Sequence, residues 1–365
     1  MAKKKKETQE GGLTTIDQLD AYLKESKADH YNYSEAVSYK VKTGSLILDV
    51  ATGGGIGPGL VRATGVSGGG KTSCGLAVAR DFQKTVENSM VIHIKAEGRL
   101  SDDMIARAGV DTSPEKWFVY KSNIFESVMH LINMLIKSNP ENKKYFFVVD
   151  SMDGLIRRRE MEKSYDESQQ VGGGATITST FLKKMNLAIT EGGHICWMIS
   201  QVRATIKADP RQRLDHRLTN ASGGNAITHF ANWIFEFQPT YKDDRIVRKV
   251  KGEDKIVGHW AKIAFQKTEN ETAGEIVKYP ICHGRTNGES IWVEYEVFDL
   301  LLAWDMIKKA GSWFSATQPL TELMQENSLE FPETFHGEAA VLSYLQENKN
   351  VTDVLTQHFK EVLLP

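Results

Sequence analysis

Short apolar runs alternate with amphipathic stretches along most of the chain. Residues 59–84 predict a strand, a glycine-rich loop and a helix, and two amphipathic helices are predicted at 124–138 and 178–190. Four further strand candidates are the apolar runs at 89–97, 145–151, 194–201 and 232–238. Strands that alternate with helices predict an α/β fold with a doubly wound, mainly parallel sheet covered on both faces. In such sheets ligands bind at the carboxyl ends of the strands.

A separate short helix is predicted near the beginning of the chain. Within residues 13–30, Ile16, Leu19 and Leu23 share one face behind a Thr-Thr-Ile-Asp start. This helix can pack on the core of its own chain or on a neighbouring molecule. The run Lys3–Lys6 precedes it and is interpreted as a solvated tail, although it is also a local basic patch.

Composition narrows the class of protein. The chain has 365 residues, 41% hydrophobic and 25% charged, which fits one large domain with appendages or two domains and excludes wholesale disorder, collagen and coiled-coil arrays. The apolar runs are too short to cross a bilayer, and Glu7 follows the lysine run where a secretory signal would be apolar. A cytoplasmic location is therefore expected. The three cysteines, Cys74, Cys196 and Cys282, fit neither a disulfide framework nor a zinc site, so a bound metal would need oxygen ligands.

The net charge restricts how nucleic acid can bind. The formal charge is −2, so the protein as a whole does not attract a polyanion. Any nucleic-acid binding must come from a local basic segment.

The segment after the first predicted strand carries the strongest chemical signal. Gly65-Val-Ser-Gly-Gly-Gly-Lys-Thr72 satisfies G-x-x-x-x-G-K-[ST] between a strand and a helix. Glycines let backbone N–H groups turn inward and bind phosphate at a helix N-terminus. Lys71 would neutralise the terminal phosphates and the Thr72 hydroxyl would ligate Mg²⁺. Asp150, at the end of a neighbouring apolar strand, is the carboxylate expected to hold that ion through water.

Two further polar residues follow predicted strands. Glu97 lies just past a strand predicted beside the loop strand, where its carboxylate could take a proton from a water in line with the γ-phosphate. Gln201 directly follows the strand 195–200 and could sense the terminal phosphate. Glu97 could instead be an ordinary exposed glutamate.

Two long loops flank this region. Residues 202–224 lack apolar periodicity and carry five basic residues against two aspartates, which suits the backbone of single-stranded nucleic acid but also a solvated insertion. Residues 160–175 end in three glycines and indicate only flexibility.

The order of these motifs resembles the RecA family of strand-exchange recombinases. The likeness runs from about residue 40 to about 315 and includes the stretches TGSLILDVATGGGIGPGLVRATGVSGGGKTS, IKAEGRLSDDMIARAGVD, VVDSMDGLIRRREME, ISQVR, TNASGGNAITHFAN and IKKAGSWFS. The resemblance implies a tail and oligomerisation helix at 1–34, an ATPase core at 35–284 and a small α/β C-terminal domain at 285–365. It also implies a DNA-dependent ATPase, using ATP and Mg²⁺, that forms a helical filament on single-stranded DNA and pairs it with homologous double-stranded DNA in recombination and repair. The resemblance further implies single-strand-binding and loader proteins as partners.

The resemblance assigns roles residue by residue. Glu97 becomes the water-activating glutamate, Gln201 the γ-phosphate sensor joined to the second DNA loop, and Lys267, with Lys71, a further catalytic lysine that reaches the nucleotide of a neighbouring subunit. The nucleotide-binding residues are Gly65, Ser67, Gly68, Gly69, Gly70, Lys71, Thr72, Ser73, Met104 and Asp150, with Thr72 and Asp150 on the metal. The DNA-binding residues are Gly172, Gly173, Gly174, Arg203, Lys207, Arg211, Arg213, Arg217, Gly223 and Gly224.

Several positions depart from the family pattern. Met104 stands where bacterial members have a tyrosine near adenine, and Phe265 stands where the family commonly has a second lysine beside Lys267. The acidic C-terminal tail is missing, and the ending resembles that of phage UvsX-type recombinases, which favours a phage-encoded member acting in the cytoplasm of a bacterial host.

Two alternatives remain at this point. A ring ATPase of the same fold, such as a replicative DNA helicase, normally adds a large N-terminal domain and an arginine finger, whereas only some thirty residues precede the core here. A recombination mediator would bind DNA without turnover, and the set Lys71, Thr72, Glu97 and Asp150 argues against it.

Overall fold

The computed structural model describes residues 14–27, 31, 37–98, 100–163, 173–204, 219–221, 224–250 and 252–364. The chain divides into two compact units, Met1–Val37 and Ser38–Pro365. In the first unit, helix α1 (Thr15–Glu25) begins at a capping box formed by Thr14 and Asp17, and it leaves Ile16, Leu19 and Tyr22 more than half exposed. The helix predicted near the beginning of the chain is therefore present, with its apolar side chains open to solvent.

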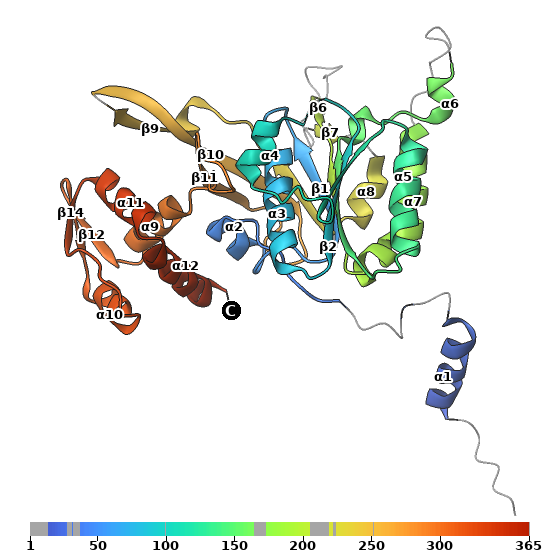
Figure 1. Cartoon of the computed structure of the whole chain (residues 1–365), viewed down its shortest axis with the longest axis horizontal. Helices are drawn as coiled ribbons and strands as arrows, with labels where there is room; N and C mark the ends of the chain where they lie inside the picture. The colour runs from blue at the N-terminus through green and yellow to red at the C-terminus, as the bar shows by residue number, and fades with distance from the viewer. Residues whose placement is uncertain are drawn as a thin grey trace, which may run out of the picture. The chain divides into compact units, whose positions relative to one another are not determined.

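The second unit is built on one large sheet (Figure 1). Within the described residues it has nine strands in the order β11-β10-β8-β1-β5-β4-β2-β3, with β9 paired to β10. The six strands that pair in parallel are β1 (Gly59–Gly65), β2 (Ser89–Lys95), β3 (Trp117–Lys121), β4 (Lys144–Asp150), β5 (Ile195–Ile199) and β8 (Trp233–Phe237). The antiparallel strands are β9 (Arg245–Val250), β10 (Glu253–Lys267) and β11 (Ile276–Cys282).

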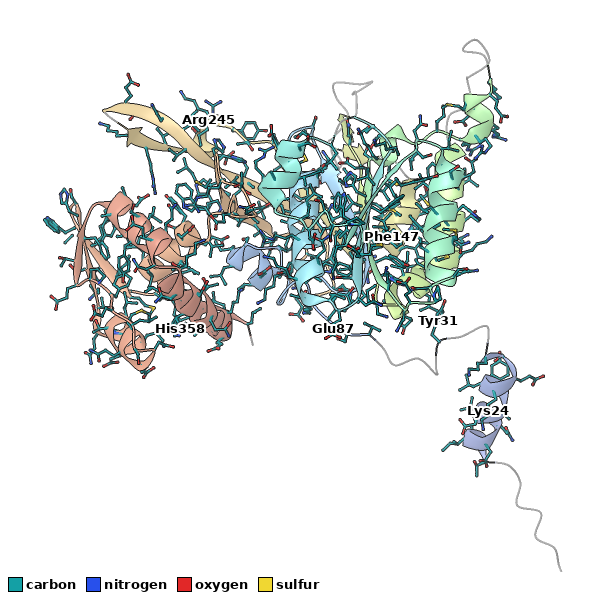
Figure 2. The ribbon with its side chains drawn as sticks, in the orientation of Figure 1. Lys24, Tyr31, Glu87, Phe147, Arg245 and His358 are labelled. Atoms are coloured by element: carbon teal, nitrogen blue, oxygen red, sulfur yellow. The ribbon has the colours of Figure 1, made fainter. Side chains whose placement is uncertain are left out.

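Helices cover both faces because the strands are apolar on both. Along β4, Phe146 and Val148 pack on the side of α3 (Lys71–Thr85), whereas Phe147 and Val149 pack on the side of α5 (Phe125–Lys137) and α7 (Gly173–Glu191). Figure 1 shows α3 on one side of the sheet and α5 and α7 on the other, and Figure 2 marks Phe147 inside this packing. Parallel strands that are buried on two faces read as continuous apolar runs, which is why β1, β2, β4, β5 and β8 were predictable.

Shorter elements complete this part of the chain. Helices α2 (Leu46–Ala51) and α4 (Asp102–Ala108) pack against the core on the α3 side of the sheet. Helix α8 (Gly224–Phe230) contributes Ile227 to the core on the side of α5 and α7. Strands β6 (Val202–Ala204) and β7 (Thr219–Ala221) form a separate antiparallel ladder. A 3₁₀ turn, η2 (Met152–Gly154), and α6 (Arg158–Met161) follow β4, and η4 (Lys242–Asp244) precedes β9.

The strand order corrects one prediction. Glu97 and Asp150 were expected to follow strands beside the loop strand, but β5 is the neighbour of β1 on that side, followed by β4 and then β2. The strands of Glu97 and Asp150 are instead neighbours of each other, in register at Lys95 and Asp150. Apolar runs of equal length carry no information about which strand lies beside which, so the sequence could not give this order.

The C-terminal region has a smaller core. Its helices are α9 (Val293–Ala303), α10 (Gln318–Glu326), α11 (Glu338–Glu347) and α12 (Lys349–Leu363). Its antiparallel sheet joins β12 (Ile307–Ala310), β13 (Trp313–Ala316) and β14 (Thr334–His336). Leu46 of α2 packs in this core with side chains of α9 and α12, whereas Leu48 of α2 packs in the core on the α3 side of the large sheet. Helix α2 therefore contributes to both cores. None of the helices in the described ranges is long and apolar enough to cross a membrane.

Candidate functional site

The glycine loop begins where β1 ends and stops where α3 starts. Gly65 has φ +136°, and a Cβ atom there would lie 2.3 Å from the carbonyl oxygen of Phe237 on β8. Gly70 is the N-cap of α3 with φ +97°. Both positions need glycine, the first because of the close backbone approach and the second because of its left-handed conformation. The loop therefore presents the N-terminus of a 15-residue helix to the carboxyl edge of the sheet.

Lys71 is held inside this loop. Its Nζ donates hydrogen bonds to the carbonyl oxygens of Gly65 and Val66 at 2.8 and 2.7 Å. Burial lowers the pKa of Lys71, while the nearby carboxylates of Asp150, Asp153 and Glu97 oppose that shift. The ammonium is thus a buried cation at the mouth of an anion cradle, where it can meet a phosphate group.

Thr72 and Asp150 meet across the sheet edge. The Thr72 hydroxyl donates to Asp150 Oδ2 at 2.8 Å. Burial raises the pKa of Asp150, the hydrogen bond from Thr72 lowers it, and the charge of Glu97 raises it again. A divalent cation beside this oxygen pair would relieve the carboxylate repulsion, so the donor set fits Mg²⁺.

Glu97 lies in a hydrogen-bonded group with two neighbours. The Ser151 hydroxyl donates to Glu97 Oε1 at 2.6 Å, and Gln201 Nε2 donates to the same oxygen at 3.1 Å. Among the described residues this leaves Oε2 as the oxygen free to accept a proton from water. Glu97 and Gln201 are 104 residues apart in sequence, and the sheet brings them together because β2, β4 and β5 are consecutive strands.

A cavity of about 510 Å³ joins these groups. It is lined by Ser67 to Ser73, Glu97, Met104, Asp150 and Gln201, so the predicted nucleotide residues and the predicted water-activating residue share one space. The lining also includes residues of β10 and β11 and of the segment that follows β11, among them Tyr279, His259 and His283. His259 Nδ1 lies 2.9 Å from His283 Nε2, and burial, followed by the charge of His283, lowers the pKa of His259.

Sequence reasoning missed Ser151, Asp153 and the two histidines. Ser151 and Asp153 lie within three residues of Asp150, so inspection of every polar residue after that strand would have found them. Asp153 Oδ2 accepts a hydrogen bond from the backbone N–H of Gln201 at 2.6 Å. The histidines gave no such signal, because the strands β10 and β11 that bring them to the cavity were not predicted.

Lys267 does not line the cavity. It pairs with Ile234 near the beginning of β8, at the edge of the sheet opposite the glycine loop, and its Nζ donates to the carbonyl oxygens of Thr228 and His229 at 3.3 and 2.8 Å. A basic side chain at these last carbonyls of α8 stabilises the helix end. Phe265, at the second lysine position of the family, is fully buried in the core.

The predicted DNA-binding residues are described only in part. Gly173 and Gly174 begin α7, Gly224 begins α8, and Arg203 belongs to β6 by its backbone. The remaining predicted residues lie outside the described residues: Gly172, Lys207, Arg211, Arg213, Arg217 and Gly223.

Comparison with known proteins agrees with this geometry. The family model of the RecA N-terminal domain matches residues 15–285, well over half of the chain. Protein RecA of Bifidobacterium breve is 26% identical over 325 residues, which are 88% of this chain and 73% of that protein. Protein RecA of Chlorobium limicola is 28% identical over 280 residues, which are 76% of this chain and 73% of that protein. Since the matched region contains the glycine loop and the whole sheet edge that brings Glu97 to Gln201, the chain belongs to the RecA family of recombinases.

Proposed function

We propose that this protein is an ATP-dependent homologous recombinase that forms helical filaments on single-stranded DNA and exchanges that strand with a homologous duplex. The observation that carries the proposal is the hydrogen bond from Gln201 to Glu97, 3.1 Å long, because Gln201 also begins the connection to β6. A residue with one contact at the hydrolytic carboxylate and one at the basic segment can couple ATP turnover to DNA binding.

The substrate and its metal fit the residues at the loop. Lys71 and the backbone of Ser67 to Gly70 would bind the phosphates of ATP, and Thr72 and Asp150 would hold Mg²⁺, the latter through water. Bound Mg²⁺ would neutralise charge on the transferred phosphoryl group. In the described residues no cluster of three or more His, Cys, Asp or Glu side chains can hold a metal by itself, so the metal would depend on the phosphate oxygens as further ligands.

Hydrolysis is assigned to Glu97 as general base. Ser151 and Gln201 both donate to Oε1 and orient the carboxylate so that Oε2 can take the proton of the attacking water. Lys71 supplies positive charge where negative charge develops in the transition state. The base of the nucleotide would bind in the part of the cavity that Met104 and His283 line.

Assembly is assigned to two features that have no catalytic role within one chain. The apolar face of α1 is exposed at Ile16, Leu19 and Tyr22, which supports an oligomerisation helix. Lys267 lies on the far edge of the sheet from Lys71, which supports an action on the nucleotide of a neighbouring subunit. The likeness of the C-terminal sequence to UvsX-type proteins supports a phage-encoded member acting in bacterial cytoplasm.

The experiment combines electron microscopy with an ATPase assay. The wild-type protein with single-stranded DNA and a slowly hydrolysed ATP analogue is expected to form helical filaments, whereas rings would indicate a helicase-like ATPase. Glu97→Gln is expected to bind ATP and DNA and to keep filaments, but to hydrolyse ATP far more slowly, because the amide keeps the shape and loses the base. The matched control is Glu87→Gln, an exposed glutamate between α3 and β2. Normal turnover in Glu97→Gln would contradict the assignment of Glu97, and a wild-type protein that binds DNA without hydrolysing ATP would be a mediator.

A further inference from the structure

Two histidines lie on the same face of the β10–β11 ladder. His259 of β10 pairs with Ile281 of β11, and His283 is two residues further along the chain. Because side chains alternate along a strand, Ile281 and His283 share the face to which His259 also belongs. The backbone N–H of His283 donates to the carbonyl oxygen of Val257 at 2.9 Å, so the second histidine is still held beside β10 where β11 ends.

The ring nitrogens of the two histidines converge. His259 Nδ1 lies 2.9 Å from His283 Nε2, and the ring planes are inclined by 50°. Two nitrogen lone pairs that face each other repel, so this spacing needs a positive group between them, either a shared proton or a metal ion. Ligands at right angles around an ion, at metal–nitrogen distances of about 2.0–2.1 Å, are about 2.9 Å apart, whereas tetrahedral ligands are about 3.3 Å apart. The observed spacing therefore fits two adjacent ligands of an octahedral or square-planar ion.

His259 is available in the form that binds metal ions. Burial, followed by the charge of His283, lowers the pKa of His259, while the charge of Asp244 opposes this shift. A pKa below the ordinary value of about 6.5 leaves the ring neutral at pH 7. A neutral imidazole keeps a lone pair on one nitrogen, and that lone pair is the metal ligand.

An ion can reach the pair from the cavity of about 510 Å³, which both histidines line. His283 is exposed and His259 is partly exposed. Over the described ranges no third His, Cys, Asp or Glu side chain joins them in a metal-binding group, so water molecules would complete the coordination. Imidazole suits nickel, copper and zinc, whereas Mg²⁺ prefers oxygen donors such as those of Thr72 and Asp150.

We propose that His259 and His283 form a chelating pair for a divalent transition-metal ion, and that the spacing of their nitrogens favours Ni²⁺ or Cu²⁺ over tetrahedral Zn²⁺. The site depends on the β10–β11 ladder and is independent of the proposed ATPase function. An ion bound there would occupy part of the cavity in which the proposed nucleotide binds.

The test measures Ni²⁺ binding to the full-length protein without an affinity tag and without nucleotide. Calorimetric titration near pH 7, with Mg²⁺ in excess, should show a tight Ni²⁺ site in the wild-type protein. His259→Asn and His283→Asn each remove one imidazole and should each weaken this site at least about a hundredfold, because two linked ligands bind about 10²–10⁴ times more tightly than one. The matched control is His130→Asn, an exposed histidine on α5, which should keep the wild-type affinity.

A second measurement identifies the ligands and keeps the test decisive if one variant folds poorly. Electron paramagnetic resonance of bound Cu²⁺ should show hyperfine coupling to two imidazole nitrogens in the wild-type protein and in His130→Asn, but not in His283→Asn. Ni²⁺ should also raise the thermal midpoint of the wild-type protein and leave that of His283→Asn unchanged. His283 is exposed, so its replacement tests the site even if His259→Asn does not fold.

The outcomes separate this site from the proposed function. If the wild-type protein has no tight Ni²⁺ site, or if His283→Asn binds Ni²⁺ as tightly as the wild-type protein, the two rings share only a proton and the proposal is wrong. Because nucleotide takes no part in the titration, a protein that binds Ni²⁺ through both histidines but does not hydrolyse ATP would refute the proposed function and support the metal site.

Discussion

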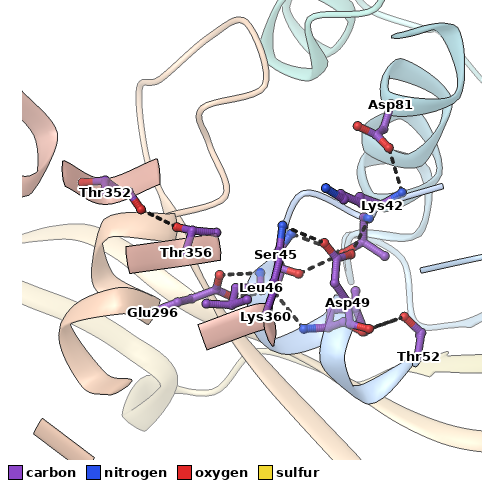
Figure 3. Close-up of polar contacts among 12 residues, drawn as sticks. Lys42, Ser45, Leu46, Asp49, Thr52, Asp81, Glu296, Thr352, Thr356 and Lys360 are labelled. Carbon is purple, nitrogen blue, oxygen red and sulfur yellow. Dashed lines mark hydrogen bonds and ion pairs between the residues drawn. The ribbon is translucent and has the colours of Figure 1, made fainter. Parts of the chain in front are cut away.

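A buried carboxyl at the junction of the core and the C-terminal region should make the stability of the protein depend on pH. Glu296 of α9 is fully buried and accepts hydrogen bonds from the Ser45 hydroxyl and, at 2.8 Å, from the backbone N–H of Leu46 at the beginning of α2 (Figure 3). Burial raises the pKa of Glu296 from 4.5 to about 8, even though the hydrogen bonds from Ser45 and Leu46 lower it.

The sign of the effect follows from proton binding. Between the unfolded pKa of 4.5 and the folded pKa of about 8, the folded protein keeps a proton that the unfolded chain has released. The free energy of unfolding therefore decreases as the pH rises through this window, and the contribution is complete below the lower value. At about 1.4 kcal/mol per pH unit, with half of the group ionised at the upper limit, the change from pH 6 to pH 8 amounts to about 2 kcal/mol.

The assay compares Glu296→Gln with the wild-type protein by chemical denaturation at pH 6 and pH 8. Because glutamine does not titrate, the loss of stability between the two pH values should be about 2 kcal/mol smaller in the variant, while all other groups cancel in the comparison. Glu347→Gln, an exposed glutamate at the end of α11, is the matched control and should keep the wild-type pH dependence. Equal pH dependence in the wild-type protein and Glu296→Gln would refute a raised pKa at this position.

Three predictions concern activity. Lys71→Ala should nearly abolish ATP hydrolysis in a phosphate-release assay, since it removes transition-state charge stabilisation worth several kcal/mol. The control Lys84→Ala, in the last turn of the same helix, should hydrolyse ATP normally, and wild-type turnover in Lys71→Ala would contradict the assignment of the phosphate loop. Affinity for single-stranded DNA, measured by fluorescence anisotropy, should fall with salt at a log–log slope of about −0.7 per neutralised phosphate. Replacing Arg203, Lys207 and Arg213 together should flatten this slope, and an unchanged slope would show that the DNA is bound elsewhere. Glu97→Gln and Lys267→Ala should each hydrolyse ATP poorly, and an equal mixture of the two should recover activity at roughly one interface in four, only with DNA and ATP present. A co-assembled mixture that stays as inactive as its components would show that the site is not shared between subunits.

The sequence was most informative where function depends on local backbone chemistry. The glycine loop, Lys71 and Thr72 are consecutive residues between a strand and a helix, so their geometry follows from the motif itself. Glu97, Asp150 and Gln201 were found because each is a polar residue at or just beyond the end of an apolar run. The structure brings Ser67 to Thr72, Glu97, Asp150 and Gln201 to one cavity, as predicted for the carboxyl edge of a parallel sheet.

The parts that could not be predicted depend on contacts between distant segments. Strand order was wrong for β2 and β4 because burial on both faces makes parallel strands look alike. Strands β3, β9, β10 and β11 were missed.

The strand order also determines which hydrogen bonds hold the backbone near Gln201. Its strand, β5, lies between β1, which ends in the glycine loop, and β4, which ends in Asp150. Both neighbours pair with β5 in parallel, so two ladders hold the backbone up to Met198 and the ladder with β1 holds Ile199. Beyond Ile199 the ladders end, and the described hydrogen bonds of the next two backbone N–H groups go from Ser200 to the carbonyl oxygen of Ala63 and from Gln201 to Asp153 Oδ2. A displacement of β6 therefore reaches Glu97 through one residue, and the bond to Asp153 resists it at the point where the sheet no longer does.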